Sequence, residues 1–265
     1  MDKYYYNHYL EMVRHRAKKE HNPKFITLSD KIASRLFVEK SIGEEYLVPI
    51  YSCGYGHPTE KDVAVIKGPY VAKANNGCNV IRISEKAPSD KDKTELRKTM
   101  SHWVNSPVFD RGRQWAYSQI NPGWIVEHLQ TLKGETPWVW RVFAFNGVGK
   151  FIQLYEYNEN PETRSPSVRA VTNYMPDGSI VEAQWGSPKK RPNGNREANM
   201  NTLKQLIELS YPLSYDIDHV RVDFMETDNG MLFSELTFYP MGGRVGVYPE
   251  SVNKMLGDFW KEARK

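Results

Sequence analysis

The stretch that most constrains the fold lies near the C-terminus and has the pattern of a β-hairpin: VRVDFMETDNGMLFSELTFYP, residues 220–240. Its centre, residues 228–230, is an Asp-Asn-Gly turn signal, because these residue types tolerate the positive φ of tight hairpins. A three-residue loop with Gly230 in the left-handed conformation would pair Thr227 with Met231. The stretch therefore predicts two antiparallel strands whose register is set by the turn.

Alternation along these two strands separates apolar from polar side chains. One face carries an apolar set: Val220, Val222, Phe224, Leu232, Leu236 and Phe238. The other face places Asp223 opposite Glu235 and Arg221 opposite Thr237. Facing like charges destabilise a sheet unless a cation lies between them, and Mg²⁺ prefers carboxylate oxygens. The pair predicts a metal site, and the alternative is an exposed polar face on which Arg221 neutralises one carboxylate.

The composition is that of an ordinary globular protein, with 265 residues, 40% hydrophobic and 26% charged. No apolar run approaches the ~20 residues of a membrane span, and the N-terminus lacks an apolar secretory signal. Cys53 and Cys78 are too few for a disulfide framework, so we expect a cytoplasmic protein. The net charge of +4 fits an anionic substrate, and without a nucleic-acid-binding motif we expect no nucleic-acid partner.

Local patterns along the chain favour an α+β protein, because helices alternate with antiparallel hairpins. Helices are predicted at 4–19, between a cap at Ser29 and Gly43, at 91–104, at 197–209 and at the C-terminus. Strands are predicted at 46–51, 63–66, 70–74, 80–83, 124–129, 138–145 and 150–157, besides the hairpin. Residues 158–196 are rich in proline and predict irregular structure.

Several segments together resemble one known superfamily. In chain order they are SDKIASRLFVEKSIGEEYLVPIY, YVAKANNG, WIVEHL, WRVFAFNG, HVRVDF and SELTFYPMGG. The chain thereby resembles ATP-grasp proteins, and within them the TupA-like group related to teichuronopeptide biosynthesis. The resemblance implies an α+β ATP-grasp fold whose two lobes hold a nucleotide between antiparallel sheets. The implied parts are a basic N-terminal helical segment (1–28), a reduced N-terminal lobe (29–60), a small lobe (61–130) and a large lobe with the metal-binding hairpin (131–265).

The resemblance assigns phosphate-binding roles to two lysines and a loop. Lys31 matches the family's first phosphate lysine, where the alternative is an ordinary surface lysine. Lys73 matches the second, and a lysine within an apolar strand must be half-buried or directed at a ligand. Asn76 and Gly77 belong to the loop that covers the phosphates, where successive N–H groups can form an anion-binding concavity.

The resemblance places Glu127 at the hinge between the lobes, where a carboxylate can accept hydrogen bonds from ribose hydroxyls. The backbone there, including His128 and Leu129, would contact the adenine edge. Arg141, at a polar position of an aromatic strand, is implied as a catalytic residue that contacts phosphate or the acceptor carboxylate. The alternatives are a solvated glutamate and a solvated arginine.

The hairpin residues also take roles from the resemblance. Asp223 and Glu235 match the Mg²⁺ ligands, and Arg221 matches a catalytic residue that stabilises the transferring phosphoryl group. The family's usual third ligand is an asparagine, but this chain has Thr237, whose hydroxyl is a poorer ligand. The implied cofactors are ATP and Mg²⁺, or Mn²⁺ in its place, with one or two metal ions.

The function implied is an ATP- and Mg²⁺-dependent carboxylate–amine ligase that acts through an acylphosphate. Its acceptor would be an anionic sugar or peptide carboxylate in surface polysaccharide biosynthesis, bound by residues 140–200 and 240–250 or by a partner. One alternative is a kinase that phosphorylates a sugar or polyol hydroxyl, for which Asp216 and Asp218 are the nearby carboxylates. A second is a non-catalytic nucleotide-binding partner of a glycosyltransferase or a membrane-associated assembly complex.

Overall fold

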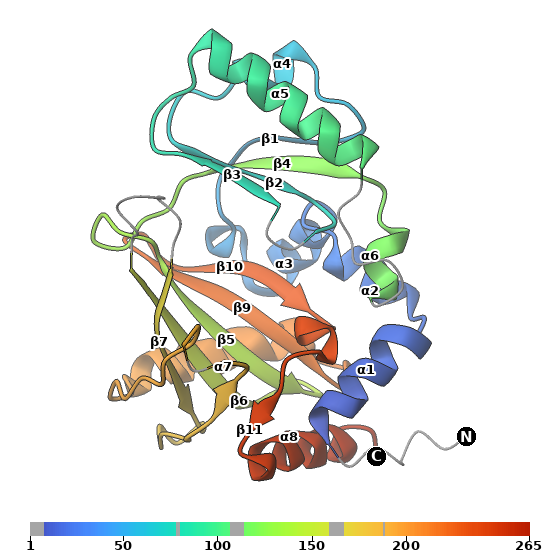
Figure 1. Cartoon of the computed structure of the whole chain (residues 1–265), viewed down its shortest axis with the longest axis vertical. Coiled ribbons are helices and arrows are strands. Elements are labelled where there is room, and N and C mark those ends of the chain that lie inside the picture. Colours follow the sequence, from blue (N-terminus) through green and yellow to red (C-terminus); the bar gives the residue numbers. More distant parts are fainter. Residues whose placement is uncertain (1–7, 78–79, 107–113, 159–166, 188) are drawn as a thin grey trace.

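The chain forms two main antiparallel sheets, one in each of two lobes that face each other in Figure 1. The computed structural model describes residues 8–77, 80–106, 114–158, 167–187 and 189–265. In the small lobe the strand order is β1 (Ile50–Tyr55), β4 (Gly123–His128), β2 (Tyr70–Ala74) and β3 (Ile81–Ser84). In the large lobe it is β10 (Gly230–Thr237), β9 (Val220–Thr227), β5 (Trp138–Phe145), β6 (Val148–Asn158) and β7 (Ser167–Tyr174). The combination of helices and antiparallel sheets confirms the α+β class.

Helix packing on one face of the small-lobe sheet identifies the side chains on the other face, which point toward the large lobe. Helix α5 (Asp90–Asn105) covers the outer face of the sheet, and a capping box of Ser89 and Asp92 starts it. The residues packed under α5 are Tyr70, Ala72, Ala74, Trp124 and Val126. Because successive strand residues point to opposite faces, Lys73 and Glu127 are directed toward the large lobe.

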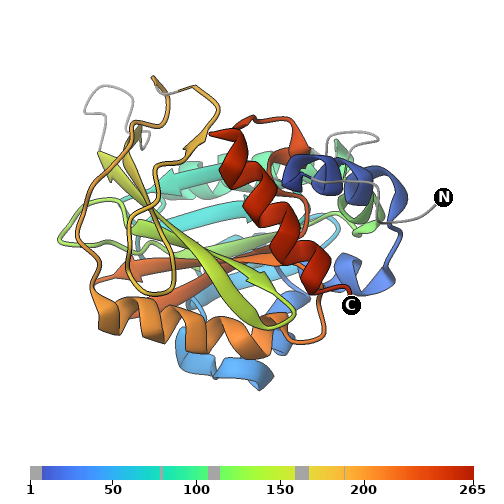
Figure 2. The ribbon, with the colours of Figure 1, turned by 90° about the horizontal axis from the view of Figure 1, so that it is seen from below.

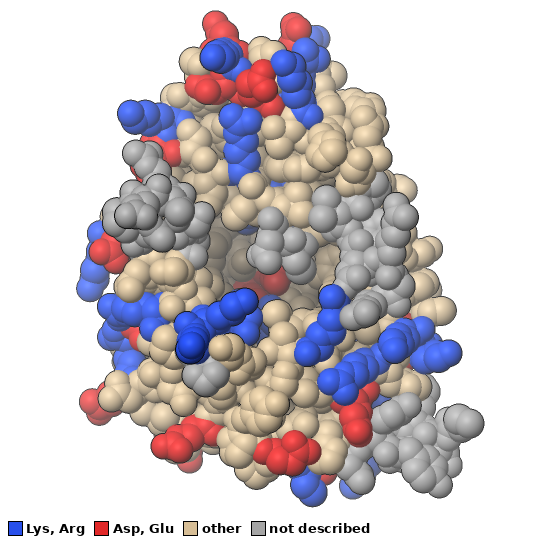
Figure 3. Space-filling view, viewed as in Figure 1, with Lys and Arg blue, Asp and Glu red and all other residues tan. Residues whose placement is uncertain are grey.

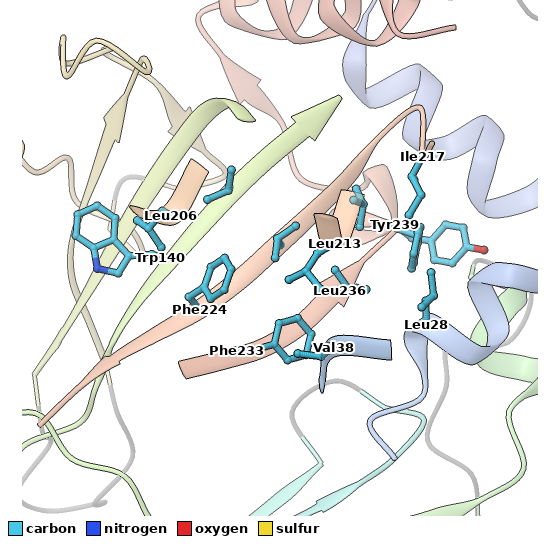
Figure 4. Packing of buried hydrophobic residues seen from close by; sticks show 14 of the residues in the cluster. Leu28, Val38, Trp140, Leu206, Leu213, Ile217, Phe224, Phe233, Leu236 and Tyr239 are labelled. Carbon is cyan, nitrogen blue, oxygen red and sulfur yellow. The ribbon is translucent and has the colours of Figure 1, made fainter. Parts of the chain in front are cut away.

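One face of the large sheet is fully covered. Helix α7 (Met200–Ser214) packs across it, and α2 (Pro23–Ser29) and α3 (Ser34–Ile42) extend the same core toward the hairpin. Figure 4 shows this core, in which Trp140, Leu206, Phe224, Phe233 and Leu236 pack together. Each of these side chains is less than 7% exposed, so this face has no room for a ligand.

The opposite face of the large sheet is covered only in part. Helices α1 (Tyr9–Lys19) and α8 (Glu250–Glu262) pack over one end of it, as Figures 1 and 2 show, together with the short strands β8 (Gln184–Trp185) and β11 (Val247–Tyr248). Phe143, Phe151 and Trp260 lie at the centre of that second core. The remaining part of the face carries polar residues and lies toward the small lobe.

The hairpin departs from its predicted turn, although the facing carboxylates are confirmed. Gly230 pairs with Thr227, so the loop has two residues instead of three. A bulge between Phe233 and Glu235 adds one residue and restores the register, so that Asp223 pairs with Glu235. The bulge shifts the alternation of the residues that precede it, so Leu232 was wrongly assigned to the core face. Phe233 lies on that face instead and packs against Phe224.

Several other expectations about single elements are confirmed. β2 and β5 have the predicted bounds, and β4 and α5 differ from theirs by one residue at each end. Positive φ values of 44° at Asn146 and 84° at Gly147 form the predicted tight turn between β5 and β6. Helix α1 begins at Tyr9, which is fully buried, and packs on the body of the protein. Residues 4–7 of the predicted helix lie outside the described residues.

Four local assignments were wrong. Residues 46–51 were predicted as a strand, but Tyr46 belongs to the short helix η1 (Glu44–Tyr46) and strand β1 begins only at Ile50. Residues 63–66 were predicted as a strand, but Thr59 and Asp62 form a capping box that starts helix α4 (Glu60–Ala64). Ser29 was predicted as a helix cap, but it ends α2, which Asn22 caps. The region 158–196 was predicted to be irregular, but it contains strand β7, which is stabilised by pairing with the preceding strand β6.

Three short elements remain. They are η1 (Glu44–Tyr46), α6 (Trp115–Gln119) and η2 (Pro240–Gly243). Strand β1 lies within the segment 29–60 that was assigned to a reduced N-terminal lobe, yet it forms the edge of the small-lobe sheet. In the described part of the chain, no helix combines the length and apolarity needed to cross a bilayer.

Candidate active site

A cavity of about 390 Å³, partly open to solvent, lies where the small-lobe sheet, the start of α3 and the hairpin meet. Figure 3 shows the surface hollowed between the lobes, with acidic atoms at the floor of the hollow. The cavity is lined by Leu28, Ser29, Lys31, Ser34, Arg35, Leu47, Lys73, Glu127, Phe233, Ser234, Glu235 and Leu236. It thus brings together four of the residues singled out in the sequence, two lysines and two carboxylates.

Lys73 and Glu127 form an ion pair on the cavity side of the small-lobe sheet. Lys73 Nζ lies 2.5 Å from Glu127 Oε2 across the β2–β4 pair. The other oxygen of Glu127 lies 3.9 Å from Arg35 Nη1, and Arg35 also donates a hydrogen bond to the Val48 carbonyl. Glu127 is therefore held between two cations, one from each side of the cavity.

Lys31 approaches the cavity from the turn that precedes α3. Its Nζ donates a 2.8 Å hydrogen bond to the carbonyl oxygen of Gly77. The turn is fixed by Asp30, which is buried and accepts hydrogen bonds from Tyr55 Oη, Asn75 Nδ2 and the Ile32 amide. This network ties Lys31 to the loop after β2.

The loop residue Asn76 is 1% exposed, and its Nδ2 has no hydrogen-bond partner among the described residues. A buried amide without a partner is unfavourable, so Asn76 retains an unused donor close to Lys31 and Gly77. A bound anion would satisfy such a donor.

The hairpin contributes a charged group centred on Arg221. Its Nε and Nη2 each donate a 2.6 Å hydrogen bond to Asp223, giving a bidentate pair. Arg221 Nη2 also lies 3.3 Å from Glu235 Oε1 and 3.1 Å from Thr237 Oγ1, and Thr237 donates to Glu235. One guanidinium group therefore contacts all three residues assigned to metal binding.

A polar row extends from the hairpin across the large sheet. Glu235 pairs with Asp223, Asp223 with Arg141, Arg141 with Gln153, and Gln153 with Asn173. Arg141 stacks on Tyr155 at 3.8 Å, and its Nε lies 3.5 Å from Asp223 Oδ2. The row spans all five strands, so residues beyond the hairpin share the polar face with the facing carboxylates.

A comparison with protein families decides the affiliation of the chain. The model of a family described as TupA-like ATPgrasp matches residues 11–261. The chain belongs to this family. A search among curated proteins finds no match.

Solved structures agree with the ATP-grasp fold at low sequence identity. D-cycloserine synthetase DcsG is 10% identical with a TM-score of 0.50, over 91% of this chain and 72% of that chain. The biotin carboxylase domain of 2-oxoglutarate carboxylase from Hydrogenobacter thermophilus is 11% identical with a TM-score of 0.50, over 90% and 46%. D-alanine–D-alanine ligase from Bacillus anthracis is 12% identical with a TM-score of 0.49, over 89% and 67%. This TupA-like chain therefore spans between about half and three quarters of these three proteins.

Burial and charge act in opposite directions on the facing carboxylates of this ATP-grasp protein. Burial raises the pKa of Asp223 above its ordinary value, against the lowering effect of Arg221 and Arg141. Burial also opposes ionisation of Glu235, but the positive charges of Lys31 and Arg221 outweigh it and lower the pKa of Glu235. A further cation between the two carboxylates would favour the charged form of both.

The donor set of this group fits a hard divalent cation. Two carboxylates and the Thr237 hydroxyl converge, and the Glu235 side chain is 27% exposed, so it keeps lone pairs open to the cavity. Among the described residues, no three or more His, Cys, Asp or Glu side chains gather as a metal cluster. Mg²⁺ would therefore take its remaining ligands from water and bound phosphate, as it commonly does.

The two assigned hinge residues after Glu127 do not line the cavity. The amide of His128 donates to the Pro49 carbonyl at 2.9 Å, and that of Leu129 donates to the Pro69 carbonyl at 3.2 Å. The His128 ring stacks on Tyr51 at 3.9 Å. Both amides are thus already used, and neither side chain lines the cavity.

Sequence reasoning missed Arg35 and Asp30. Arg35 follows Lys31 by four residues, which is the spacing that places two residues on one side of a helical turn. Asp30 directly precedes Lys31, and its contacts with Tyr55 and Asn75 form only in the folded chain. Gln153 and Asn173 were missed because their row meets the hairpin only through the long-range pairing of β5 with β9.

Proposed function

We propose that the protein is an ATP- and Mg²⁺-dependent carboxylate–amine ligase that acts through an acylphosphate. The observation that carries the proposal is the single cavity in which Lys31 and Lys73 face Glu235. Cations outnumber carboxylates in its lining: Lys31, Arg35 and Lys73 against Glu127 and Glu235. Such a balance favours a polyanionic ligand that carries a metal ion, as ATP does.

The position of each residue in the site indicates which part of MgATP it would contact. Lys31 and Lys73, with the unused Asn76 amide group, would hold the phosphates, and Glu127 would accept hydrogen bonds from the ribose. Asp223, Glu235 and Thr237 would hold Mg²⁺, which supplies positive charge to the β- and γ-phosphate oxygens when bound.

Arg221 and Arg141 supply the fixed positive charge near the transferring group. In the first step, an acceptor carboxylate oxygen attacks the γ-phosphorus of ATP, and the bond to the β-phosphate oxygen breaks to release ADP. In the second, an amine attacks the acyl carbon, phosphate leaves and the amine proton is lost to solvent. Arg221 would stabilise the negative charge in both steps, because preorganised donors cost no reorganisation at the moment of reaction.

The position of two other carboxylates disfavours a sugar or polyol kinase. A kinase needs a carboxylate placed to accept the hydroxyl proton, and Asp216 and Asp218 were the candidates. Asp218 accepts hydrogen bonds from Arg16, Trp260 and Arg264, which hold its pKa well below the ordinary value against burial. Asp216 borders a separate hollow near Lys24. Neither lines the candidate site.

The family name supports an acceptor in cell-surface polymer synthesis. We propose a uronic acid or peptide carboxylate as acceptor and an amine or amino acid as the second substrate. A glycosyltransferase or membrane-associated assembly complex would deliver the acceptor.

The test uses hydroxylamine, a strong nucleophile that converts acylphosphates into hydroxamates. The protein is incubated with ATP, MgCl₂, hydroxylamine and either glucuronate or a glutamyl peptide. We expect hydroxamate, ADP and phosphate in equal amounts, and calorimetry should detect MgADP binding. A phosphorylated sugar with ADP and no phosphate would identify a kinase, and absence of MgADP binding would exclude both enzymes.

A further inference from the structure

A second, cationic pocket lies beside the end of the hairpin. It is a hollow of about 540 Å³ lined by Arg14, Ala17, Lys18, Gly242 and Arg244. Three of these residues are cationic and none is acidic. In Figure 3, basic side chains gather below and to the right of the central hollow, over the region where Figure 1 places α1 and η2. Cations collected in a concave surface create a positive potential that an anion relieves.

The helix α1 shapes one wall of this pocket. Arg14 and Lys18 are four residues apart and therefore lie on the same side of the helix, with the small Ala17 between them. Arg16, on the opposite side, is fully buried and fixes α1 to the body of the protein. The two cations are thus carried by a rigid element.

The loop η2 forms the other wall and is pressed against α1. Met241, Gly242 and Gly243 have φ values of 53°, 57° and 67°, a left-handed run that turns the chain back toward the helix. A Cβ at Gly243 would lie 2.6 Å from Arg14 Cγ and 2.9 Å from the Leu10 carbonyl oxygen. Arg14 Nε donates a 2.7 Å hydrogen bond to the Gly243 carbonyl, which holds its guanidinium group at the pocket.

The pocket lies only a few residues along the chain from the candidate active site. Thr237, which contacts Glu235, is followed after five residues by Gly242, so their Cα atoms are at most about 17 Å apart. A ligand of moderate length could therefore occupy the pocket with one end and reach the facing carboxylates with the other.

We infer that this pocket, lined by Arg14, Lys18 and Arg244, binds a second anionic group of the acceptor. The inference rests on the proposed ligase function and narrows its substrate class. The acceptor carries the reacting carboxylate at one end and a further carboxylate or phosphate at the other. The concave shape favours a discrete anionic group of a soluble or polymer-borne acceptor over a flat membrane surface.

The experiment titrates the protein with tricarballylate, a small tricarboxylate, by calorimetry in the presence of saturating MgADP. The nucleotide keeps the candidate active site occupied. We expect weak, saturable binding that Lys18→Ala and Arg244→Ala each reduce about tenfold, because each removes one charge-assisted contact. Lys204→Ala, which removes an exposed lysine from α7, is the matched control and should leave binding unchanged.

The outcomes separate this inference from the proposed function. If MgADP does not bind, the proposed function fails first. If MgADP binds but tricarballylate does not, or binds equally to all variants, the pocket is not an acceptor subsite. A second arm measures sedimentation with phosphatidylglycerol vesicles. Vesicle binding that depends on Lys18, without tricarballylate binding, would assign the pocket to a membrane and overturn the inference.

Discussion

Asp218 and Asp223 lie five positions apart at strand β9, yet the protein uses them differently. Both Asp218 oxygens are fully engaged: Oδ1 accepts from Arg16 and its neighbour's amide, and Oδ2 accepts from Trp260 at 2.8 Å and Arg264 at 2.6 Å. Within the described residues, Asp223 accepts hydrogen bonds from Arg221 only, with Arg141 Nε at 3.5 Å. The first carboxylate clamps α1 and α8 onto the sheet.

The two carboxylates differ in how many of their hydrogen-bond acceptor positions remain unused. A carboxylate offers about four acceptor positions, which the donors around Asp218 fill. Asp223 keeps unused positions, faces Glu235 across the strand pair and has a raised pKa because it is buried. Burial of a charged residue therefore does not by itself mark a site; unfilled acceptor positions beside a second carboxylate that lines the cavity do.

Replacing each of the two aspartates by asparagine tests whether they have different roles. Asp223→Asn removes a metal ligand, so we expect ligation to fall at least about a thousandfold, at the upper end of the effect of removing one electrostatic stabiliser. Stability should also fall by about 3 kcal/mol, because the buried Arg221 loses the anionic partner of its bidentate pair. Hydroxamate formation and urea unfolding are measured on the same preparation.

Glu226→Gln is the matched control for Asp223→Asn. Glu226 lies on the same strand but accepts a hydrogen bond from Trp140 on the other side of the sheet, and glutamine can also accept it. We expect activity within about twofold of wild type, since no electrostatic contact to the site is lost. Full activity in Asp223→Asn would show that the facing carboxylates are structural and would remove the contrast with Asp218.

Asp218→Asn should also lower stability, but it should keep activity. It removes one of two anionic partners from Arg16, which is fully buried, and from Arg264, and both arginines keep Glu20. Breaking a buried ion pair costs about 3 kcal/mol. We use the lower end of the usual range because the Asp218 side chain is 24% exposed. The folded fraction should retain activity within about threefold, since no electrostatic contact at the site is removed. A stable but inactive variant would place Asp218 in the reaction instead.

A smaller effect on stability is expected from His219, the residue that follows Asp218. His219 is fully buried, and its Nδ1 must donate to the Ala144 carbonyl while Nε2 accepts from Tyr9. Burial and the nearby Arg16 lower its pKa to about 3. The unfolded chain takes up a proton below pH ~6.5 and the folded chain does not, so stability falls as the pH decreases.

The expected loss is about 2 kcal/mol between pH 7 and pH 5, measured by urea unfolding at each pH. Asp218 is charged in both states at pH 5, so it does not contribute to this change. His219→Gln keeps a donor and an acceptor but does not titrate, and the difference between its pH profile and that of wild type isolates the histidine. Parallel profiles would mean that His219 is not held neutral.

Much of the candidate site could be predicted from sequence because its parts are local patterns. The alternation around Asp223 and Glu235 gave their pairing, and the bulge before Glu235 corrected the error in the turn. The proximity of Arg35 to Glu127 and of Arg141 to Asp223 could not be predicted, since each joins segments distant in sequence. Strand β7 was missed because the prolines of residues 158–196 predicted irregular structure.

The sequence by itself determined the residue types, their order and the two faces of each strand, because strand periodicity is a property of the local backbone. Only the tertiary structure decided that Lys31, Lys73 and Glu127 meet Glu235 around one cavity. It also decided that Asp218 is saturated with donors while Asp223 is not. Burial and hydrogen-bond saturation depend on which distant elements pack together, and no local pattern encodes that choice.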